Sequence, residues 1–225
     1  MTPPDIEMRV KRTLTEIPDT VALVAAAKTR TPEEIDQALR AGVRIVGMNY
    51  VQEAASAVDS LGRSATQWHM IGHLQRNKVR ESIHLFDCIQ TVDSLRLARK
   101  IDAEASAAGI VMPVLIEVNS ASEAQKAGVA PEETLDFLRE LSALNALRVD
   151  GLMTMGPLVE NPEAIRPYFR LTKALFDEAR TTRIEGIDLR VLSMGMSDSY
   201  RVAIEEGATM VRLGTTLFGP RSASR

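Results

Sequence analysis

The residues best suited to chemistry lie in two groups, one near the end of the chain and one near its start. Residues 189–219 read LRVLSMGMSDSYRVAIEEGATMVRLGTTLFG. Two apolar runs in this stretch end abruptly in small residues, with a helix expected over residues 198–206 and stopped by Gly207. Such turns leave backbone N–H groups free, and Ser197 is expected at a helix N-terminus. The stretch therefore predicts a phosphate site formed by two turns, the alternative being ordinary turns of an α/β protein.

Lys28 is the candidate nucleophile. It follows VALVAAA, seven apolar residues at 21–27, and burial at the end of such a run favours the neutral, reactive amine. A lysine so placed can form a Schiff base with an aldehyde. Arg212 stands in the apolar run MVRLG, two residues before Gly214, and an arginine that points into a core needs a partner. The alternatives are a solvated lysine beyond a strand and a structural salt bridge of Arg212.

Several other chemistries have no support in the sequence. His69 and His73 are four residues apart, but Gly72 and the strand-like WHMI between them argue against a helical metal pair, so no metal is expected. There is no CxxC and no G-x-S-x-G, and the single Cys88 lies in an apolar run, where we expect a core residue. The net charge of −3, with scattered Lys and Arg, makes nucleic acid an unexpected partner.

A repeated strand and helix pattern must position these residues. The expected strands are residues 21–27, 44–47, 68–72, 86–90, 113–119, 149–155, 189–193 and 210–214. Stretches with helical spacing alternate with these strands, which predicts parallel βαβ units. Eight such units in 225 residues predict an α/β fold, a single (β/α)8 TIM barrel spanning residues 1–225. The alternative is an open doubly wound sheet, although no G-x-G-x-x-G follows the first strand.

The helices carry their own local signals. Ile6, Val10, Leu14 and Ile17 recur at helical spacing and predict an extra N-terminal helix. Thr31, Pro32 and Glu34 predict a capping box at the start of the next helix. A later helix is expected to be capped at Asp93, and the one near Pro167 is expected to bury Leu171, Leu175 and Ala179.

The carboxyl ends of barrel strands form one rim, where residues are able to do chemistry. The expected rim comprises Lys28, Asn49, residues 69–73, Thr91, Asn119, Thr154, residues 193–197 and residues 212–215.

With these positions the chain resembles the pyridoxal 5′-phosphate (PLP) homeostasis protein family. The matching segments are AAAKT at 25–29, GMNYVQE at 47–53, WHMIGHLQRNK at 68–78, TVDS at 91–94, GLMTM at 151–155, SMGMSDSY at 193–200 and VRLGTTLFG at 211–219. That family is similar to the N-terminal barrel of alanine racemase, fold type III among PLP proteins.

The resemblance implies a role for each rim residue. Lys28 would form a Schiff base with PLP, Arg212 would face the pyridine nitrogen, and Asn49 and His73 would lie beside the cofactor. The phosphate would be held by Ser193, Met196, Ser197, Gly214 and Thr215. The family usually has glutamate where this chain has Met48, from which we expect a somewhat altered cofactor affinity.

The implied function is to carry or buffer PLP and so maintain vitamin B6 and amino-acid pools. A fixed cation at Arg212 disfavours protonation of the ring nitrogen and weakens the ring as an electron sink. We expect no counterpart of the second domain that supplies a tyrosine base to racemases, and we do not expect Tyr50, Tyr168 or Tyr200 to lie where such a base would come from.

Two enzyme hypotheses remain beside the carrier. One is a weak PLP-dependent amino-acid racemase that uses Lys28 as one base and His73 or a water as the other. The second is a sugar-phosphate barrel enzyme without PLP, in which Lys28 polarises a carbonyl.

The setting of the protein follows from composition. With no apolar signal core at the start, and a longest apolar run of only seven residues, we expect a cytoplasmic monomer without a membrane segment. The resemblance implies PLP as a partner, with apo forms of PLP-dependent enzymes as recipients.

Overall fold

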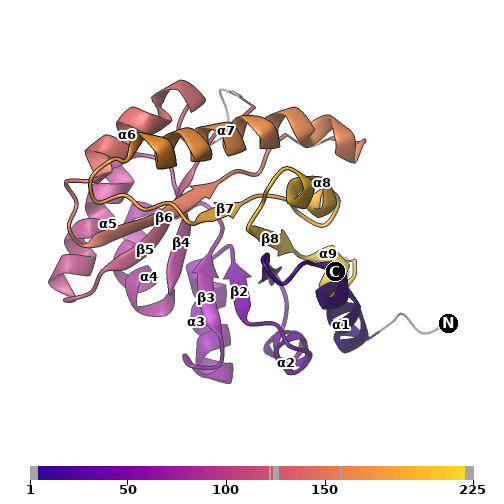
Figure 1. Cartoon of the computed structure of the whole chain (residues 1–225). Coiled ribbons are helices and arrows are strands. Elements are labelled where there is room, and N and C mark those ends of the chain that lie inside the picture. The colour runs from indigo at the N-terminus through magenta and orange to yellow at the C-terminus, as the bar shows by residue number, and fades with distance from the viewer. Residues whose placement is uncertain (1–4, 122, 124–126, 158, 221–225) are drawn as a thin grey trace.

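The computed structural model describes residues 5–121, 123, 127–157 and 159–220. Eight parallel strands close into a barrel in chain order, so that β1 pairs with both β2 and β8 (Figure 1). The strands are β1 Ala22–Ala26, β2 Ile45–Met48, β3 Gln67–Met70, β4 Cys88–Val92, β5 Met112–Glu117, β6 Leu147–Met153, β7 Val191–Ser193 and β8 Met210–Leu213. The predicted (β/α)8 barrel is confirmed, and the open-sheet alternative is wrong.

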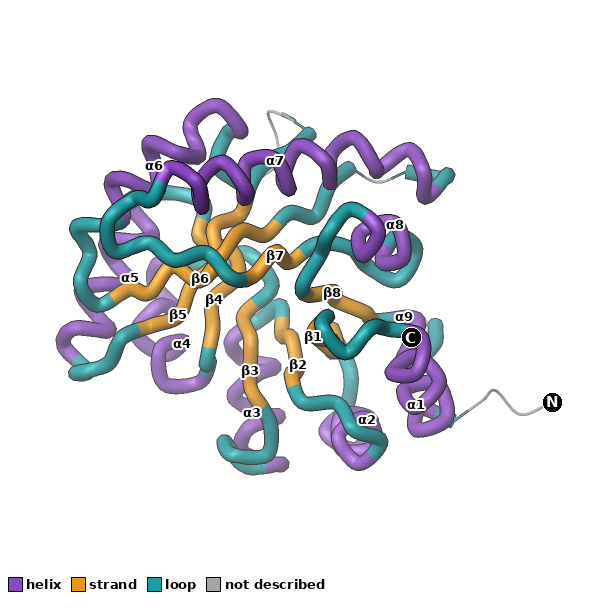
Figure 2. Tube along the Cα trace, in the orientation of Figure 1, coloured by secondary structure: helices purple, strands orange, loops and turns teal. Residues whose placement is uncertain are grey.

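The helices lie around the outside of the strands, as the tube in Figure 2 shows. They are α1 Ile6–Glu16, α2 Pro32–Arg40, α3 Val51–Leu61, α4 Val79–Leu85, α5 Leu95–Ala107, α6 Thr134–Leu141, α7 Arg166–Thr182, α8 Tyr200–Glu205 and α9 Thr215–Phe218, with 3-10 turns η1 Arg76–Lys78, η2 Pro131–Glu133 and η3 Pro162–Ile165. α1 is the predicted extra helix, and it contacts α2 and α9. Within the described residues, no helix is both long and apolar enough to cross a bilayer.

The barrel interior changes from apolar to polar along its strands. Cys88, Leu115, Val191 and Met210 belong to apolar clusters inside the barrel. Residues two positions further along a strand point to the same side. Those residues are Gln90, Glu117, Ser193 and Arg212, all buried. The carboxyl half of the interior is therefore polar, while a much larger apolar cluster fills the space between strands and helices.

The predicted capping box at the start of α2 is confirmed. The Thr31 hydroxyl accepts a hydrogen bond from the Glu34 N–H, and the Glu34 carboxylate accepts one from the Thr31 N–H, at 3.3 and 2.9 Å. Since both contacts satisfy N–H groups of the first helical turn, we expect Thr31→Ala to lower the free energy of unfolding by about 1 kcal/mol. Urea denaturation measures this. Thr15→Ala, at an exposed position of α1, should change it by less than about 0.5 kcal/mol, and equal losses would contradict the role of the cap.

One local prediction is wrong, and a second is wrong in part. The cap of α5 is Ser94 rather than Asp93, because the Ser94 hydroxyl accepts from the Leu97 N–H at 3.4 Å. On α7, Ala179 is buried as predicted and Leu175 is partly buried against the core, but Leu171 is 38% exposed. The other buried residues of α7 are Phe169, Thr172 and Phe176. Both apolar sets on α7 have helical spacing, and the side with the two larger phenylalanine rings faces the core.

Strand β4 is displaced from its expected bounds. It covers Cys88–Val92 rather than residues 86–90. Asp87 does not extend the strand at its start, because its carboxylate accepts from the Trp68 N–H and from Arg63. Thr91 is consequently buried within the strand, where its hydroxyl donates to the Gly72 carbonyl at 2.7 Å. Cys88 is buried, as predicted.

Candidate functional site

Lys28 lies at the carboxyl end of β1 and is half-buried rather than fully solvated. Its strand is flanked by β2, which Asn49 follows, and by β8, which Gly214 follows. A Cβ at Gly214 would lie 3.4 Å from the Ala26 carbonyl oxygen, so this turn runs close beside β1. The Lys28 Nζ lies 5.2 Å from the centre of the Tyr50 ring. The fold therefore brings the candidate amine next to Asn49 and the last turn of the barrel.

The two turns predicted to bind phosphate are joined through Ser197. Its hydroxyl oxygen accepts from the N–H groups of Gly214 and Thr216, both at 3.2 Å. The expectation that Ser197 begins the helix after β7 is wrong, because α8 starts at Tyr200 with Ser199 as its N-cap residue. Ser197 instead faces the start of α9, a short helix that sequence reasoning missed. Thr215 is exposed beside these amides.

Two further predicted residues, Met196 and His73, line a common cavity. This cavity, of about 330 Å³, is also lined by Glu117, Asn119 and Thr154. The His73 side chain is 64% exposed, and its Nδ1 lies 3.6 Å from a carboxylate oxygen of Asp93. In the described part of the chain, no cluster of three or more His, Cys, Asp or Glu side chains could hold a metal ion.

Arg212 crosses the polar half of the barrel interior. It is 4% exposed and donates to the Ser193 hydroxyl at 2.7 Å and to the Thr154 carbonyl at 2.9 Å. Burial lowers the pKa of Arg212 to about 10, while Glu117 acts to raise it, so the guanidinium is a cation at pH 7. Both hydrogen-bond partners of the Arg212 guanidinium are neutral, so the structure does not show the structural salt bridge that was the alternative.

The Ser193 hydroxyl does not face the mouth. Ser193 is fully buried, and its hydroxyl donates to the Gln90 amide oxygen at 2.8 Å while it accepts from Arg212. The hydroxyl of Ser193 is thus engaged inside the barrel, and the predicted contact of Ser193 with a phosphate stays a prediction for its backbone N–H alone. Ser193 instead lies between Arg212 and Gln90 in a chain of hydrogen bonds.

Gln90 and His69 complete that chain. The Gln90 amide nitrogen lies 2.8 Å from His69 Nδ1. Because the Gln90 oxygen accepts from Ser193, its NH2 group donates to Nδ1, which places the ring proton on Nε2. Burial lowers the pKa of His69 to about 4, so the ring is neutral at pH 7. Sequence reasoning placed His69 on the rim and weighed it as a metal ligand, but it missed Gln90, although Gln90 is two residues beyond buried Cys88.

Glu117 is a buried carboxyl group in the wall of the mouth cavity. It is 6% exposed. Burial, reinforced by the negative charge of Asp93, raises the pKa of Glu117 to about 7, against the opposing effect of Arg212. Its expected protonation state thus changes close to neutral pH.

Stability should depend on pH through Glu117. The folded chain keeps this proton up to about pH 7, whereas the unfolded chain loses it near 4.5. The favourable contribution is therefore complete below about pH 4.5 and is lost as the pH rises through 7, in total about 3 kcal/mol. Glu117→Gln should remove this part of the decline. Urea unfolding from pH 4.5 to 8 measures it, and equal slopes in the parent and the variant would contradict the prediction.

Met48 faces away from the mouth. It is 1% exposed and belongs to the apolar cluster between strands and helices. The preceding Gly47 faces the interior, since a Cβ there would lie 2.8 Å from Val24 and 2.7 Å from Ile71. An effect of Met48→Glu on cofactor affinity stays a prediction, and it would have to pass through the backbone of β2.

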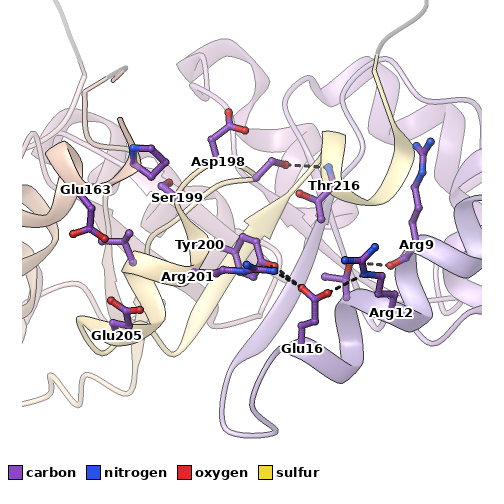
Figure 3. A pocket seen from close by; sticks show the side chains of 14 residues that line it. Arg9, Arg12, Glu16, Glu163, Asp198, Ser199, Tyr200, Arg201, Glu205 and Thr216 are labelled. Atoms are coloured by element: carbon purple, nitrogen blue, oxygen red, sulfur yellow. Dashed lines mark hydrogen bonds and ion pairs between the residues drawn. The ribbon is translucent and has the colours of Figure 1, made fainter. Parts of the chain in front are cut away.

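Next to the Ser197 turn, a pocket of about 740 Å³ lies between α1 and α8 (Figure 3). Glu16 accepts hydrogen bonds there from Arg201, Tyr200 and Arg12. The bonds from Arg201, then Arg12 and Tyr200, lower the pKa of Glu16 to about 2. These hydrogen bonds connect α1 to α8, the helix that follows the Ser197 turn. The Tyr200 hydroxyl therefore has a structural partner, Glu16.

The chain is similar to known proteins in both sequence and fold. The family "Alanine racemase, N-terminal domain" matches residues 7–222. A protein of Aquifex aeolicus named pyridoxal phosphate homeostasis protein is 43% identical over 199 residues, which cover 88% of this chain and 86% of that protein. Its namesake in Escherichia coli is 36% identical over 212 residues, or 92% of this chain and 89% of the other.

Solved structures agree with these matches. PipY of Synechococcus elongatus, solved with PLP bound, is 33% identical with a TM-score of 0.88, covering 95% of this chain and all of that chain (100%). Alanine racemase of Clostridium difficile has a TM-score of 0.80 at 16% identity, covering 97% of this chain and 57% of the racemase. The second match shows a shared barrel alone.

Proposed function

This chain belongs to the pyridoxal phosphate homeostasis protein family, within the larger alanine racemase N-terminal domain family, and from that premise we propose that it carries or buffers PLP on the amine of Lys28. The role is to maintain vitamin B6 and amino-acid pools without a robust reaction of its own. PipY, a relative with nearly the same fold, is solved with PLP bound.

The residues of the mouth fit this cofactor. PLP needs an amine for its aldehyde, donors for its phosphate and a partner for its ring nitrogen. Lys28 offers the amine beside the Gly214 turn, and the N–H groups of Gly214 and Thr216 converge on Ser197. Arg212 offers a buried cation whose direct partners are neutral. The observation that carries the proposal is the meeting of these three chemistries at one end of the barrel.

The arrangement favours binding over catalysis. When bound, PLP supplies an aldehyde and an electron-withdrawing ring. A cation fixed at Arg212 disfavours a proton on the ring nitrogen, which weakens carbanion stabilisation. His73, the candidate second base of a racemase, is largely exposed and faces Asp93.

Reductive trapping tests the proposal. Purified protein should show an absorbance band near the visible edge that borohydride removes, and intact mass should then reveal one adduct. Peptide mapping should place it on Lys28, and Lys28→Ala should show neither band nor adduct. Lys78, which lines a neighbouring hollow with Asn49 and Tyr50, provides the contrast. An adduct on Lys78 would contradict the proposal. The absence of the absorbance band would also contradict it and would favour a sugar-phosphate enzyme without PLP.

Exchange of α-deuterium separates the carrier from a weak racemase. We expect the parent protein to release deuterium from labelled alanine no faster than Lys28→Ala. Release at an enzyme-like rate that Lys28→Ala abolishes would favour the racemase.

The proposed setting is a cytoplasmic monomer that passes PLP to apo forms of PLP-dependent enzymes. Size-exclusion chromatography with light scattering measures the oligomeric state. Reactivation of an apoenzyme by the loaded protein, faster than by free PLP at the same concentration, would support direct transfer.

A further inference from the structure

The turn that follows Lys28 has an unfavourable backbone conformation. Thr29 has a φ of 63°, in the left-handed region that β-branched residues rarely adopt. Such conformations persist only where neighbouring contacts hold them, and they concentrate at functional sites. The Thr29 N–H donates to the Glu53 carboxylate at 3.2 Å, and the Thr29 hydroxyl donates to the Lys28 carbonyl at 2.6 Å. The carboxylate of Glu53 thus holds the turn from outside.

A second contact reaches Lys28 from the same part of the molecule. Tyr50 is the N-cap residue of α3, and Glu53 lies in its first turn. The Lys28 Nζ lies 5.2 Å from the centre of the Tyr50 ring, the geometry of a cation–π contact. Tyr50 is 48% exposed. One turn of helix therefore contacts both the backbone after Lys28 and the end of its side chain.

We propose that the start of α3 is a clamp on Lys28, in which Glu53 fixes the turn that aims the side chain and Tyr50 holds the free ammonium. Both are positioning residues. The ammonium must leave the ring before its nitrogen can bond to a ligand, so Tyr50 stabilises the unattached state and favours release. This inference rests on the proposed function, because release matters to a protein that gives its ligand up.

The reactivity of Lys28 in the cofactor-free protein tests the Tyr50 contact. Trinitrobenzenesulfonate modifies free amines, and peptide mass spectrometry follows its reaction at Lys28. Loss of an exposed cation–π contact, worth about 0.5–1 kcal/mol, corresponds to a change of about twofold to fivefold in the labelling rate. Tyr50→Leu should speed labelling of Lys28 by that factor, whereas Tyr50→Phe keeps the ring and should label at the parent rate. After both proteins are loaded with PLP, the Tyr50→Leu protein should lose PLP on dialysis more slowly than the parent, by a similar factor.

A double-mutant cycle tests the Glu53 contact. Glu53→Leu removes the acceptor for the Thr29 N–H and should change the labelling rate of Lys28 by about twofold to tenfold. Glu53→Gln keeps an oxygen acceptor and should stay near the parent. Glycine adopts the left-handed conformation freely, so Glu53→Leu should have a smaller effect in a Thr29→Gly background.

Each result decides one part of the clamp. Equal labelling in Tyr50→Leu and Tyr50→Phe would overturn the role of the ring. Additive effects of Glu53→Leu and Thr29→Gly would overturn the role of the carboxylate. Because labelling uses no PLP, it judges the clamp even if borohydride trapping finds no cofactor on Lys28, and the two proposals fail separately.

Discussion

Replacing Gly151 with alanine should leave little folded barrel, with the free energy of unfolding reduced by more than about 4 kcal/mol. Gly151 lies within β6, between β5 and β7. A Cβ at this position would lie 1.7 Å from the Val191 carbonyl oxygen of the neighbouring strand. No side-chain rotation relieves that clash, because the backbone fixes the position of the Cβ and the Val191 oxygen is itself a backbone atom, so β6 and β7 must separate.

The local geometry of β6 explains the close approach. Val149 pairs with Val114, but Gly151 pairs with Leu115, so Asp150 is an extra residue on β6. Such a bulge shifts which residues face the interior. Beyond it, Leu152 lies in the outer cluster and Met153 inside the barrel. The bulge thereby sets the side to which the following mouth residues point.

Urea denaturation and the yield of soluble protein measure the effect. The matched control is Gly109→Ala, at a glycine with φ 69° and nothing within 4 Å of the added Cβ. It should lose only about 1 kcal/mol, the cost of a left-handed alanine. A Gly151→Ala protein as stable as the Gly109→Ala protein would contradict the predicted clash.

Much of the fold could be predicted because its signals are local. Apolar runs of strand length and helical spacing gave eight βα units, and the box of Thr31 and Glu34 is a contact between residues three apart. The position of Lys28 at a rim follows from its place after β1. Gly151, in contrast, was only one letter of a matching segment, since its requirement comes from the Val191 carbonyl, forty residues away in sequence.

The interior of the site could not be predicted for the same reason. Ser193 has the residue type of a phosphate ligand, yet its hydroxyl is used by Gln90 and Arg212. Ser193 and its two partners lie on three different strands, β7, β4 and β8. Sequence periodicity can place each of them inside the barrel, but only closure of the barrel decides which of them meet. Tyr50 was likewise considered only as a catalytic base, although it contacts Lys28.

Replacing Gln90 with leucine should lower the free energy of unfolding by about 4 kcal/mol, since two buried polar groups lose their partners at about 1–3 kcal/mol each and one hydrogen-bond network is broken. The Ser193 hydroxyl would lose its acceptor and His69 Nδ1 its donor. Leucine nearly fills the same volume, so the loss reports the polar contacts rather than a cavity.

The same variant should disturb the mouth. Within the described chain, the guanidinium of Arg212 donates hydrogen bonds to two groups, the Ser193 hydroxyl and the Thr154 carbonyl. Once the Ser193 hydroxyl is free to turn, one of the two bonds that orient the guanidinium is no longer fixed. We therefore expect Gln90→Leu to weaken PLP binding by about tenfold, or 1.4 kcal/mol, as measured by titration of the apoprotein.

A neighbouring hydrogen bond provides the control. Thr91→Val removes the bond from Thr91 to the Gly72 carbonyl and should cost about 1–2 kcal/mol without altering Arg212. The ¹⁵N chemical shift of His69 Nδ1 reports its hydrogen bond directly, and it should change in Gln90→Leu but not in Thr91→Val. If His69 and the stability of Gln90→Leu both stay as in the parent, the chain from His69 to Arg212 does not position the cation, and Arg212 must be held by its fit among the surrounding strands.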